Sequence, residues 1–307
     1  MSKMPLPLKL FIGGTGYQIF EKYMQFSKLK PNVASATETI NYIKKNRSSI
    51  ARYGDGELLW AFQARQSGNF EKNSSELAKA LRKVLTDPQP NLLIGIPNIF
   101  NGLKDETTTA KTYWEGLIIR HGYQIVHLLK SRKKYYDSRF TRIYMDSKDK
   151  NIDFESKFNS IKEIWDNRNV LIIEGNKSRF GVGNDLLDNA SSIKRILCPS
   201  ENAFEKYKNI LSITEKIAST VDDVLILLAL GPTATVLTYD LFKDGFQAID
   251  IGHLDIEYDW YKLHAKTKIS IPGKYVNEAN DKFTEVTPDK LIKYNQEVIA
   301  EIKGENL

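Results

Sequence analysis

Val224-Leu225-Ile226-Leu227-Leu228-Ala229-Leu230 is an unbroken apolar run, and Gly231-Pro232-Thr233 follows it directly. A strand with one face in water alternates apolar and polar residues, whereas a strand covered on both faces is apolar throughout. The glycine can end the strand, and Pro232 suits the first turn of a helix. This stretch therefore predicts a buried strand of a parallel sheet that leads straight into a helix.

The same alternation of strand and helix continues along the chain. Strands are predicted at residues 49–53, 92–96, 140–145, 170–174, 193–198, 224–230 and 247–251. Helices are predicted at residues 35–46, 74–86, 108–120, 155–167, 201–219, 232–244 and 287–303. At the start of the last helix, Thr287 can cap, Pro288 fits the first turn, and Val286 can pack against Leu291. The pattern predicts an α/β fold with a mostly parallel sheet flanked by helices.

Composition and charge limit the classes of function. The chain has 307 residues, of which 41% are hydrophobic and 27% charged, as in ordinary globular proteins. No repeat or low-complexity linker divides it, so we expect an N-terminal extension over 1–34 and a single domain over 35–307. The net charge of +6 suits anionic small ligands or an acidic membrane surface. No RNA-binding aromatic motif or zinc spacing accompanies it, so a nucleic-acid partner is not expected.

The single cysteine and the N-terminal segment bear on location. Cys198 follows an apolar pair, is expected in the core, and excludes an intrachain disulfide, which points to a reducing, cytoplasmic compartment. No secretory signal is evident, and 8–24 is too short and polar to span a bilayer. The lysines around this segment are compatible with contact at the inner face of the membrane. The preferred interpretation is a helix packed on the domain or on a partner.

Arg52-Tyr53-Gly54-Asp55-Gly56-Glu57 follows the first predicted strand. The glycines allow a sharp turn and close approach of a ligand, and two carboxylates two residues apart can face one cation. Oxygen ligands of this kind suit Mg²⁺ or Mn²⁺, which complete their shell with water and substrate phosphate. The alternative is a tight turn in which Glu57 merely favours the first turn of the next helix.

A glycine-bearing loop, Gly175-Asn176-Lys177-Ser178-Arg179-Phe180-Gly181-Val182-Gly183-Asn184-Asp185, follows the fourth predicted strand. Its glycines permit close backbone approach, Lys177 and Arg179 supply positive charge, and a helix expected to begin near Asn184 would offer free N–H groups. These features would suit a diphosphate. The spacing matches neither the dinucleotide fingerprint nor the Walker loop. An ordinary surface loop is the alternative.

Two further loops end strands at the same predicted edge. In the turn after Leu230, Thr233 could donate to an anion, although a plain helix start needs no function. In the stretch 250–260, Asp255 or Glu257 could act as a base or metal ligand, and His253 could orient a hydroxyl. An N-capping Asp255 and a structural histidine are the alternatives. Arg142 could also reach a ligand site.

Four ordered blocks, residues 52–57, 174–186, 230–235 and 249–258, resemble the successive blocks of the bacterial GT-D glycosyltransferases. The resemblance covers about residues 35–275. It implies a Rossmann-like fold, a nucleotide-sugar donor (UDP-glucose in the best-known member) and a divalent metal. The family's Asp-x-Glu metal motif corresponds to Asp55 and Glu57. The acceptors it implies are cell-surface polysaccharides or glycoproteins, such as a streptococcal serine-rich adhesin.

The resulting hypothesis is a glycosyltransferase that depends on Mn²⁺ or Mg²⁺. The residues expected to bind the donor are Arg52, Gly54, Lys177, Ser178, Arg179, Gly181, Gly183, Asn184, Asp185 and Thr233. Asp255 is the first candidate for accepting the proton of the acceptor hydroxyl, followed by Glu257 and His253. Two alternatives stay open, a nucleotide-sugar hydrolase or pyrophosphorylase and a non-catalytic, nucleotide-sugar-binding subunit of a glycan assembly complex.

Overall fold

One parallel sheet organises the molecule. The computed structural model describes residues 6–63, 70–87, 89–129, 134–279 and 291–304. Over these residues, eight strands form a sheet with the order β3-β2-β1-β7-β6-β4-β5-β8, and every neighbouring pair is parallel. The strands are β1 (Ser49–Arg52), β2 (Leu92–Ile96), β3 (Tyr136–Asp137), β4 (Asn169–Gly175), β5 (Ser192–Cys198), β6 (Val224–Ala229), β7 (Gln247–Asp250) and β8 (Val298–Glu301).

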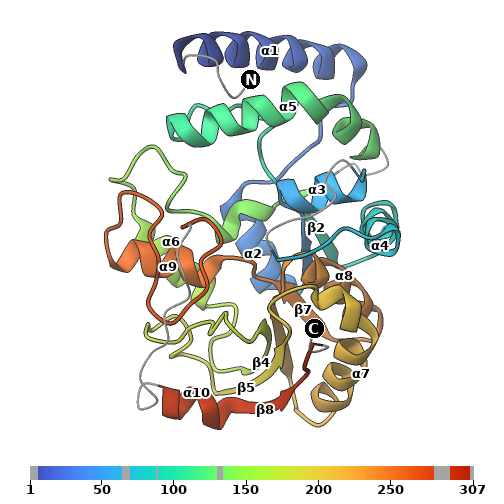
Figure 1. The fold of residues 1–307 in the computed structure, drawn as a ribbon, viewed down its shortest axis with the longest axis vertical. Helices are drawn as coiled ribbons and strands as arrows, with labels where there is room; N and C mark the ends of the chain where they lie inside the picture. Colours follow the sequence, from blue (N-terminus) through green and yellow to red (C-terminus); the bar gives the residue numbers. More distant parts are fainter. Residues whose placement is uncertain (1–5, 64–69, 88, 130–133, 280–290, 305–307) are drawn as a thin grey trace.

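Helices cover both faces of this sheet (Figure 1). They are α1 (Leu6–Ser27), α2 (Ala36–Asn46), α3 (Asp55–Ala61), α4 (Ser75–Thr86), α5 (Thr108–Leu129), α6 (Phe154–Lys162), α7 (Tyr207–Ala218), α8 (Gly231–Lys243), α9 (Leu254–Lys262) and α10 (Ile292–Glu297). Short 3₁₀ turns lie at Ser138–Thr141 and Ala203–Lys206. The predicted α/β fold with a parallel sheet is therefore confirmed.

The core explains why the strands are apolar throughout. In β6, Leu225 and Leu227 pack into one buried cluster, while Ile226 and Leu228 pack into another. Successive side chains of a strand point to opposite faces, so each face of the sheet has its own core. Cys198, at the end of β5, is buried as predicted.

Three predictions of secondary structure are wrong. Residues 140–145, predicted as a strand, instead contain the end of the 3₁₀ turn Ser138–Thr141, in which the Asp137 carboxylate accepts from the Arg139 amide at 2.8 Å; the edge strand β3 lies before them at Tyr136–Asp137. No helix begins near Asn184, since residues 176–189 form successive turns with Gly181 and Gly183 at positive φ. The helix expected at 287–303 is only α10, and β8 takes up the following residues. Thr287, Pro288 and Val286 lie outside the described residues.

The helix α1 packs along α5, which agrees with the preferred interpretation of the N-terminal segment. Glycines allow the close approach: a Cβ on Gly13 would lie 2.7 Å from Oε2 of Glu115, and one on Gly16 would lie 2.8 Å from Cδ1 of Ile119. In the described part of the chain, no helix is both long and apolar enough to cross a bilayer. The boundary between extension and domain at residues 34 and 35 stays a prediction.

Candidate active site

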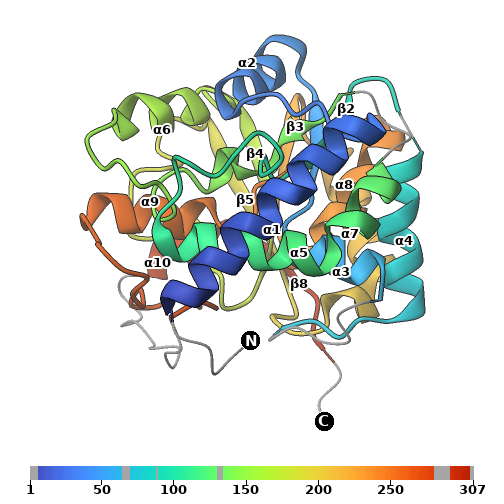
Figure 2. The ribbon, with the colours of Figure 1, turned by 90° about the horizontal axis from the view of Figure 1, so that it is seen from above.

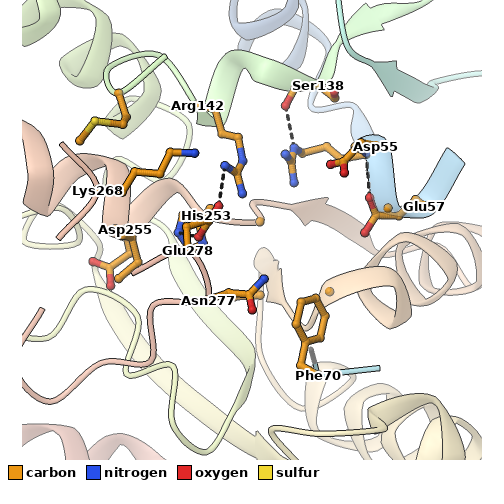
Figure 3. Close-up of a pocket in the computed structure, with 18 of the residues that line it drawn as sticks. Asp55, Glu57, Phe70, Ser138, Arg142, His253, Asp255, Lys268, Asn277 and Glu278 are labelled. Carbon is orange, nitrogen blue, oxygen red and sulfur yellow. Dashed lines mark hydrogen bonds and ion pairs between the residues drawn. The ribbon is translucent and has the colours of Figure 1, made fainter. Parts of the chain in front are cut away.

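A cavity of about 830 Å³ opens beyond the carboxyl ends of the strands (Figure 3). Since all strands run the same way, the loops that follow them meet at this edge, as is usual for ligand sites in open α/β sheets. The turns after β1, β4 and β7 line the cavity, and Tyr113 and Trp114 of α5 line it from another side. Loops more than a hundred residues apart in sequence are thereby gathered into one pocket.

Asp55 and Glu57 form an acidic pair in the first turn of α3, and both line the cavity. Oε2 of Glu57 accepts from the Gly54 amide at 2.8 Å, and the Tyr113 hydroxyl donates to Asp55. Burial raises the pKa of Glu57, and the carboxylates of Asp250 and Asp55 raise it further. This concentration of negative charge would be relieved by a cation.

The two carboxylates of Asp55 and Glu57 fit a divalent metal whose coordination shell is completed by water and by the substrate. Among the described residues, no group of three or more His, Cys, Asp or Glu side chains could hold an ion by itself. Mg²⁺ commonly takes only one or two carboxylates and fills its remaining positions with water and phosphate oxygens. Asp55 and Glu57 supply ligands of that number and chemistry.

Arg52 lies beside this pair and is held by three neighbours. Its Nε donates to the Ser138 carbonyl at 2.8 Å, and its Nη1 lies 3.3 Å from Oδ1 of Asp250. A Cβ on Gly252 would lie 2.0 Å from Nη1, and the φ of Gly252 is +47°, so only glycine fits this turn. The arginine therefore lines the cavity in a fixed orientation.

The loop after β4 is only partly in the cavity. Lys177 and Ser178 line it, whereas Arg179, Gly181, Gly183, Asn184 and Asp185 do not. The sequence predicted a helix whose N-terminus would point into the cavity. Residues 176–189 form turns instead, so the later residues of the loop lie outside the cavity. Asp185 instead pairs with Lys162 at 2.9 Å and accepts from the Tyr258 hydroxyl, beside a separate small cavity.

Two of the three candidate proton acceptors are occupied by other partners. Oδ2 of Asp255 lies 2.6 Å from Nζ of the buried Lys274, and Oδ1 accepts from the side-chain Nδ2 of Asn184 at 2.8 Å. Glu257 is buried, does not line the cavity, and accepts from the amides of Tyr144 and Met145 at 3.0 and 2.9 Å. Asp255 lines the cavity, at an edge remote from Asp55 (Figure 3).

The third candidate, His253, belongs to a chain of three side chains in the middle of the cavity (Figure 3). Its Nε2 lies 2.9 Å from Oε2 of Glu278, whose Oε1 lies 2.9 Å from Nη1 of Arg142. Burial alone would raise the pKa of Glu278, but the neighbouring His253 and the guanidinium of Arg142 outweigh it and hold that pKa well below its usual range. The imidazole thus has a carboxylate within 2.9 Å, although this contact does not have the geometry of a hydrogen bond.

Thr233 lies just behind the cavity rather than in its lining. Its hydroxyl donates to Oε2 of Glu71 at 3.2 Å, and burial raises the pKa of Glu71 to about 7. Glu71 and Phe70 line the cavity, and the Phe70 ring lies against Gly231 so closely that a Cβ there would be 2.3 Å from it.

Comparison with known proteins identifies the family. The model of the glycosyltransferase GT-D fold matches residues 50–279, which include all the turns described above. The chain belongs to the GT-D family of glycosyltransferases. The resemblance seen in the four sequence blocks is confirmed.

Curated and solved relatives of this GT-D chain agree. The probable glycosyl transferase Gly of Streptococcus gordonii is 35% identical over 277 residues, covering 89% of this chain and 39% of the relative. Glycosyltransferase GlyD of Streptococcus pneumoniae serotype 4 is 37% identical over 272 residues, covering 88% of this chain and 32% of the relative. The GT-D chain thus spans about a third of the length of these curated relatives.

Two solved structures share the fold of the GT-D chain. One, described as a domain of unknown function with a distinct glycosyltransferase fold, has a TM-score of 0.84 and 34% identity and covers 95% of this chain and all of its own. Another, a glycosyltransferase from Streptococcus sanguinis, has a TM-score of 0.82 and 31% identity and covers 89% of this chain and all of its own.

Several residues of the GT-D cavity carried no signal in the sequence. Glu278, Glu71 and Phe70 lie outside the predicted strands and helices, in stretches without a motif. Of the three linked side chains Arg142, Glu278 and His253, the sequence indicates Arg142 and His253 but not Glu278. Lys266 and Lys268 lie close together in a stretch for which no helix or strand is predicted. This cluster of positive charge is a sequence signal for the segment that contains Glu278.

Proposed function

We propose that this chain is a metal-dependent glycosyltransferase that moves a hexose from a nucleotide-sugar donor, a UDP-hexose, to a hydroxyl of a cell-surface glycan or glycoprotein. Family membership supports transfer of a sugar. The observation that carries the proposal is that the acidic pair, Asp55 and Glu57, and the basic turn with Lys177 and Ser178 line the same cavity. The UDP-hexose donor and the surface acceptor come from the family resemblance.

Asp55 and Glu57 would hold Mn²⁺ or Mg²⁺. When bound, such an ion supplies Lewis-acid stabilisation to the negative charge that grows on the departing diphosphate. The raised pKa of Glu57 supports this assignment, since a buried carboxylate beside two others needs a cation to remain ionised.

The cations of the cavity would share in binding the donor. Lys177 lies at the turn after β4, and Lys266 and Lys268 line the cavity from the segment after α9. Fixed positive groups around a departing diphosphate stabilise the transition state without reorganising at the moment of reaction. Arg52, held by Asp250 and Ser138, would contribute a guanidinium in a fixed position.

His253 is the proton acceptor that the contacts favour. In an inverting transfer, the acceptor oxygen bonds to the anomeric carbon, the bond to the diphosphate breaks, and the hydroxyl proton passes to a base. Asp255 and Glu257 already accept hydrogen bonds or pair with Lys274. Nε2 of His253 lies 2.9 Å from Oε2 of Glu278, which leaves Nδ1 as the ring nitrogen that could accept the proton. A base oriented by a carboxylate follows the general logic of catalytic triads.

Release of UDP from UDP-glucose, measured with and without Mn²⁺ and with and without glycan acceptors, tests the proposal. We expect Mn²⁺ to stimulate release, acceptors to increase it, and Asp55→Asn or Glu57→Gln to lower it by at least about 100-fold, because several kcal/mol of metal stabilisation are lost. Asp188→Asn, an exposed acid outside the cavity, is the matched control and should have no effect.

Three outcomes would contradict the proposal. Full activity in Asp55→Asn and Glu57→Gln would remove the metal assignment. Metal-stimulated release that no acceptor increases would indicate a hydrolase. Tight donor binding without any turnover would indicate a non-catalytic subunit.

A further inference from the structure

The sequence of α1 is apolar on more than one face. Over residues 6–27 only Lys9, Glu21 and Lys22 are charged. One face packs on α5 and buries Tyr17 and Met24. The outer face carries polar side chains such as Gln18 and Gln25 but also exposes Ile19 and Phe26, and a patch of large exposed apolar side chains indicates a contact surface.

The outer face exposes large apolar side chains. Phe26 is 92% exposed and Ile19 is 64% exposed. The two are seven residues apart, which places them on one stripe of the helix. Tyr23 lies between them, and its ring centroid is 6.0 Å from that of Tyr123 on α5, itself 62% exposed. We call Ile19, Tyr23, Phe26 and Tyr123 the outer strip; α1 lies across α5 on the outside of the molecule (Figure 2).

Exposed cations surround the outer strip. Lys22 lies on α1 itself, and Lys28 and Lys30 follow its end. The amide of Tyr135 donates to the Asn32 carbonyl at 2.8 Å, which brings Lys134 to the same end of the helix. Arg120 of α5 is exposed as well, whereas the acids near α1 in the described part of the chain include Glu21, Glu38 and Glu115, which is buried beneath the helix. The charge around the strip is therefore clearly positive.

We infer that the outer strip and its cations bind an anionic membrane surface, with α1 lying in the plane of the interface. Aromatic and aliphatic side chains flanked by lysines are typical of helices that lie at the boundary between headgroups and acyl chains. Anionic lipids attract such lysines within a Debye length. A second copy of the chain fits less well, because pairing two strips would bring like charges together. The inference goes beyond the proposed function and does not depend on it.

Co-sedimentation of the full chain with lipid vesicles tests the inference. We expect binding to phosphatidylcholine vesicles with about 30% phosphatidylglycerol, weakening with salt, and no binding to phosphatidylcholine alone. The double variant Ile19→Ser/Phe26→Ser should bind at least about tenfold more weakly, from lost apolar burial. Lys22→Glu/Lys28→Glu/Lys30→Glu should bind about 100-fold more weakly, at roughly fivefold per cation.

Matched controls lie elsewhere on the surface. Ile292 of α10 is 57% exposed, at the end of the molecule opposite α1 (Figure 1), and Ile292→Ser should bind like the wild type. The triple variant Lys208→Glu/Lys216→Glu/Lys243→Glu, at exposed lysines away from the strip, should weaken binding less than Lys22→Glu/Lys28→Glu/Lys30→Glu. UDP release in free solution should be unchanged in the strip variants, which separates this test from that of the proposed function.

Three results would overturn the inference. The first is a lack of sedimentation with both vesicle types, and the second is equal binding by the wild type and the strip variants. The third is a wild-type dimer, seen by sedimentation velocity, that the Ile19→Ser/Phe26→Ser variant converts to a monomer; that result would assign the strip to a second copy of the chain.

Discussion

The acidic and imidazole side chains after β1 and β7 differ mainly in their partners. Glu57 faces other carboxylates, Asp255 pairs with Lys274, and His253 meets Glu278. The sequence could predict that such residues gather at one edge, because they follow the ends of parallel strands. It could not predict their partners, since Lys274 and Glu278 come from a segment without periodicity. The partners decide which group is available to a ligand.

Substitution of His253 and of Asp255 should therefore have different effects. We expect His253→Gln to lower kcat by at least about 100-fold, as is typical for loss of a general base, with the KM for the donor changed only a few-fold. Asp255→Asn should instead lower the free energy of unfolding by about 1 kcal/mol, because Lys274 loses one of its two buried carboxylate partners and keeps Asp259. Steady-state kinetics and urea unfolding of both variants measure these quantities. A loss of kcat confined to Asp255→Asn, with unchanged stability, would restore Asp255 as the base.

At the scale of elements, the connection after β4 is set by buried charges rather than by helix propensity. Glu174 accepts from the Phe180 amide at 2.7 Å and pairs with Arg195 of β5 at 2.7 Å. Arg195 also pairs with Glu297 at the end of α10, immediately before β8. These contacts join residues that are distant in sequence. The local pattern of apolar and polar residues therefore predicted the buried strands, but it predicted neither the turns of 176–189 nor the strand β8.

Removal of Arg195 tests this buried network. Arg195→Leu should lower the free energy of unfolding by about 3–5 kcal/mol, because Glu174 is left as an uncompensated buried charge. Glu297→Gln, whose partner keeps Glu174, should cost only about 1 kcal/mol. Urea unfolding provides both values, and equal losses in the two variants would contradict the assignment.

The loss in Arg195→Leu should also depend on pH. Burial raises the pKa of Glu174 even with Arg195 present, so without the arginine the folded state binds a proton that the unfolded state releases. Stability of the variant should then fall as the pH rises above the ordinary range of a glutamate pKa, relative to wild type. A difference that is independent of pH would show that Glu174 is not the source of the loss.

At the scale of the whole molecule, one consequence of the sheet dominates. The strands are all parallel, and their side chains are buried on both faces of the sheet. Every turn that follows a strand therefore lies at the same edge of the sheet. The apolar runs were sufficient to predict this edge, and four sequence blocks were sufficient to predict the family. The reach of each loop into the cavity was not predictable, because it depends on turns such as 176–189 and on α5, whose Tyr113 contacts Asp55 from the other side.

Calorimetric titration of UDP in the presence and absence of Mn²⁺ tests most directly whether Asp55 and Lys177 act on one ligand. The account predicts that UDP binds at least about tenfold more tightly with Mn²⁺ than without it, the metal bridging carboxylates and phosphate. Asp55→Asn should remove this gain, and Lys177→Ala should weaken binding with Mn²⁺ present. UDP affinity that is the same with and without Mn²⁺, and unaltered in Asp55→Asn and Lys177→Ala, would contradict it.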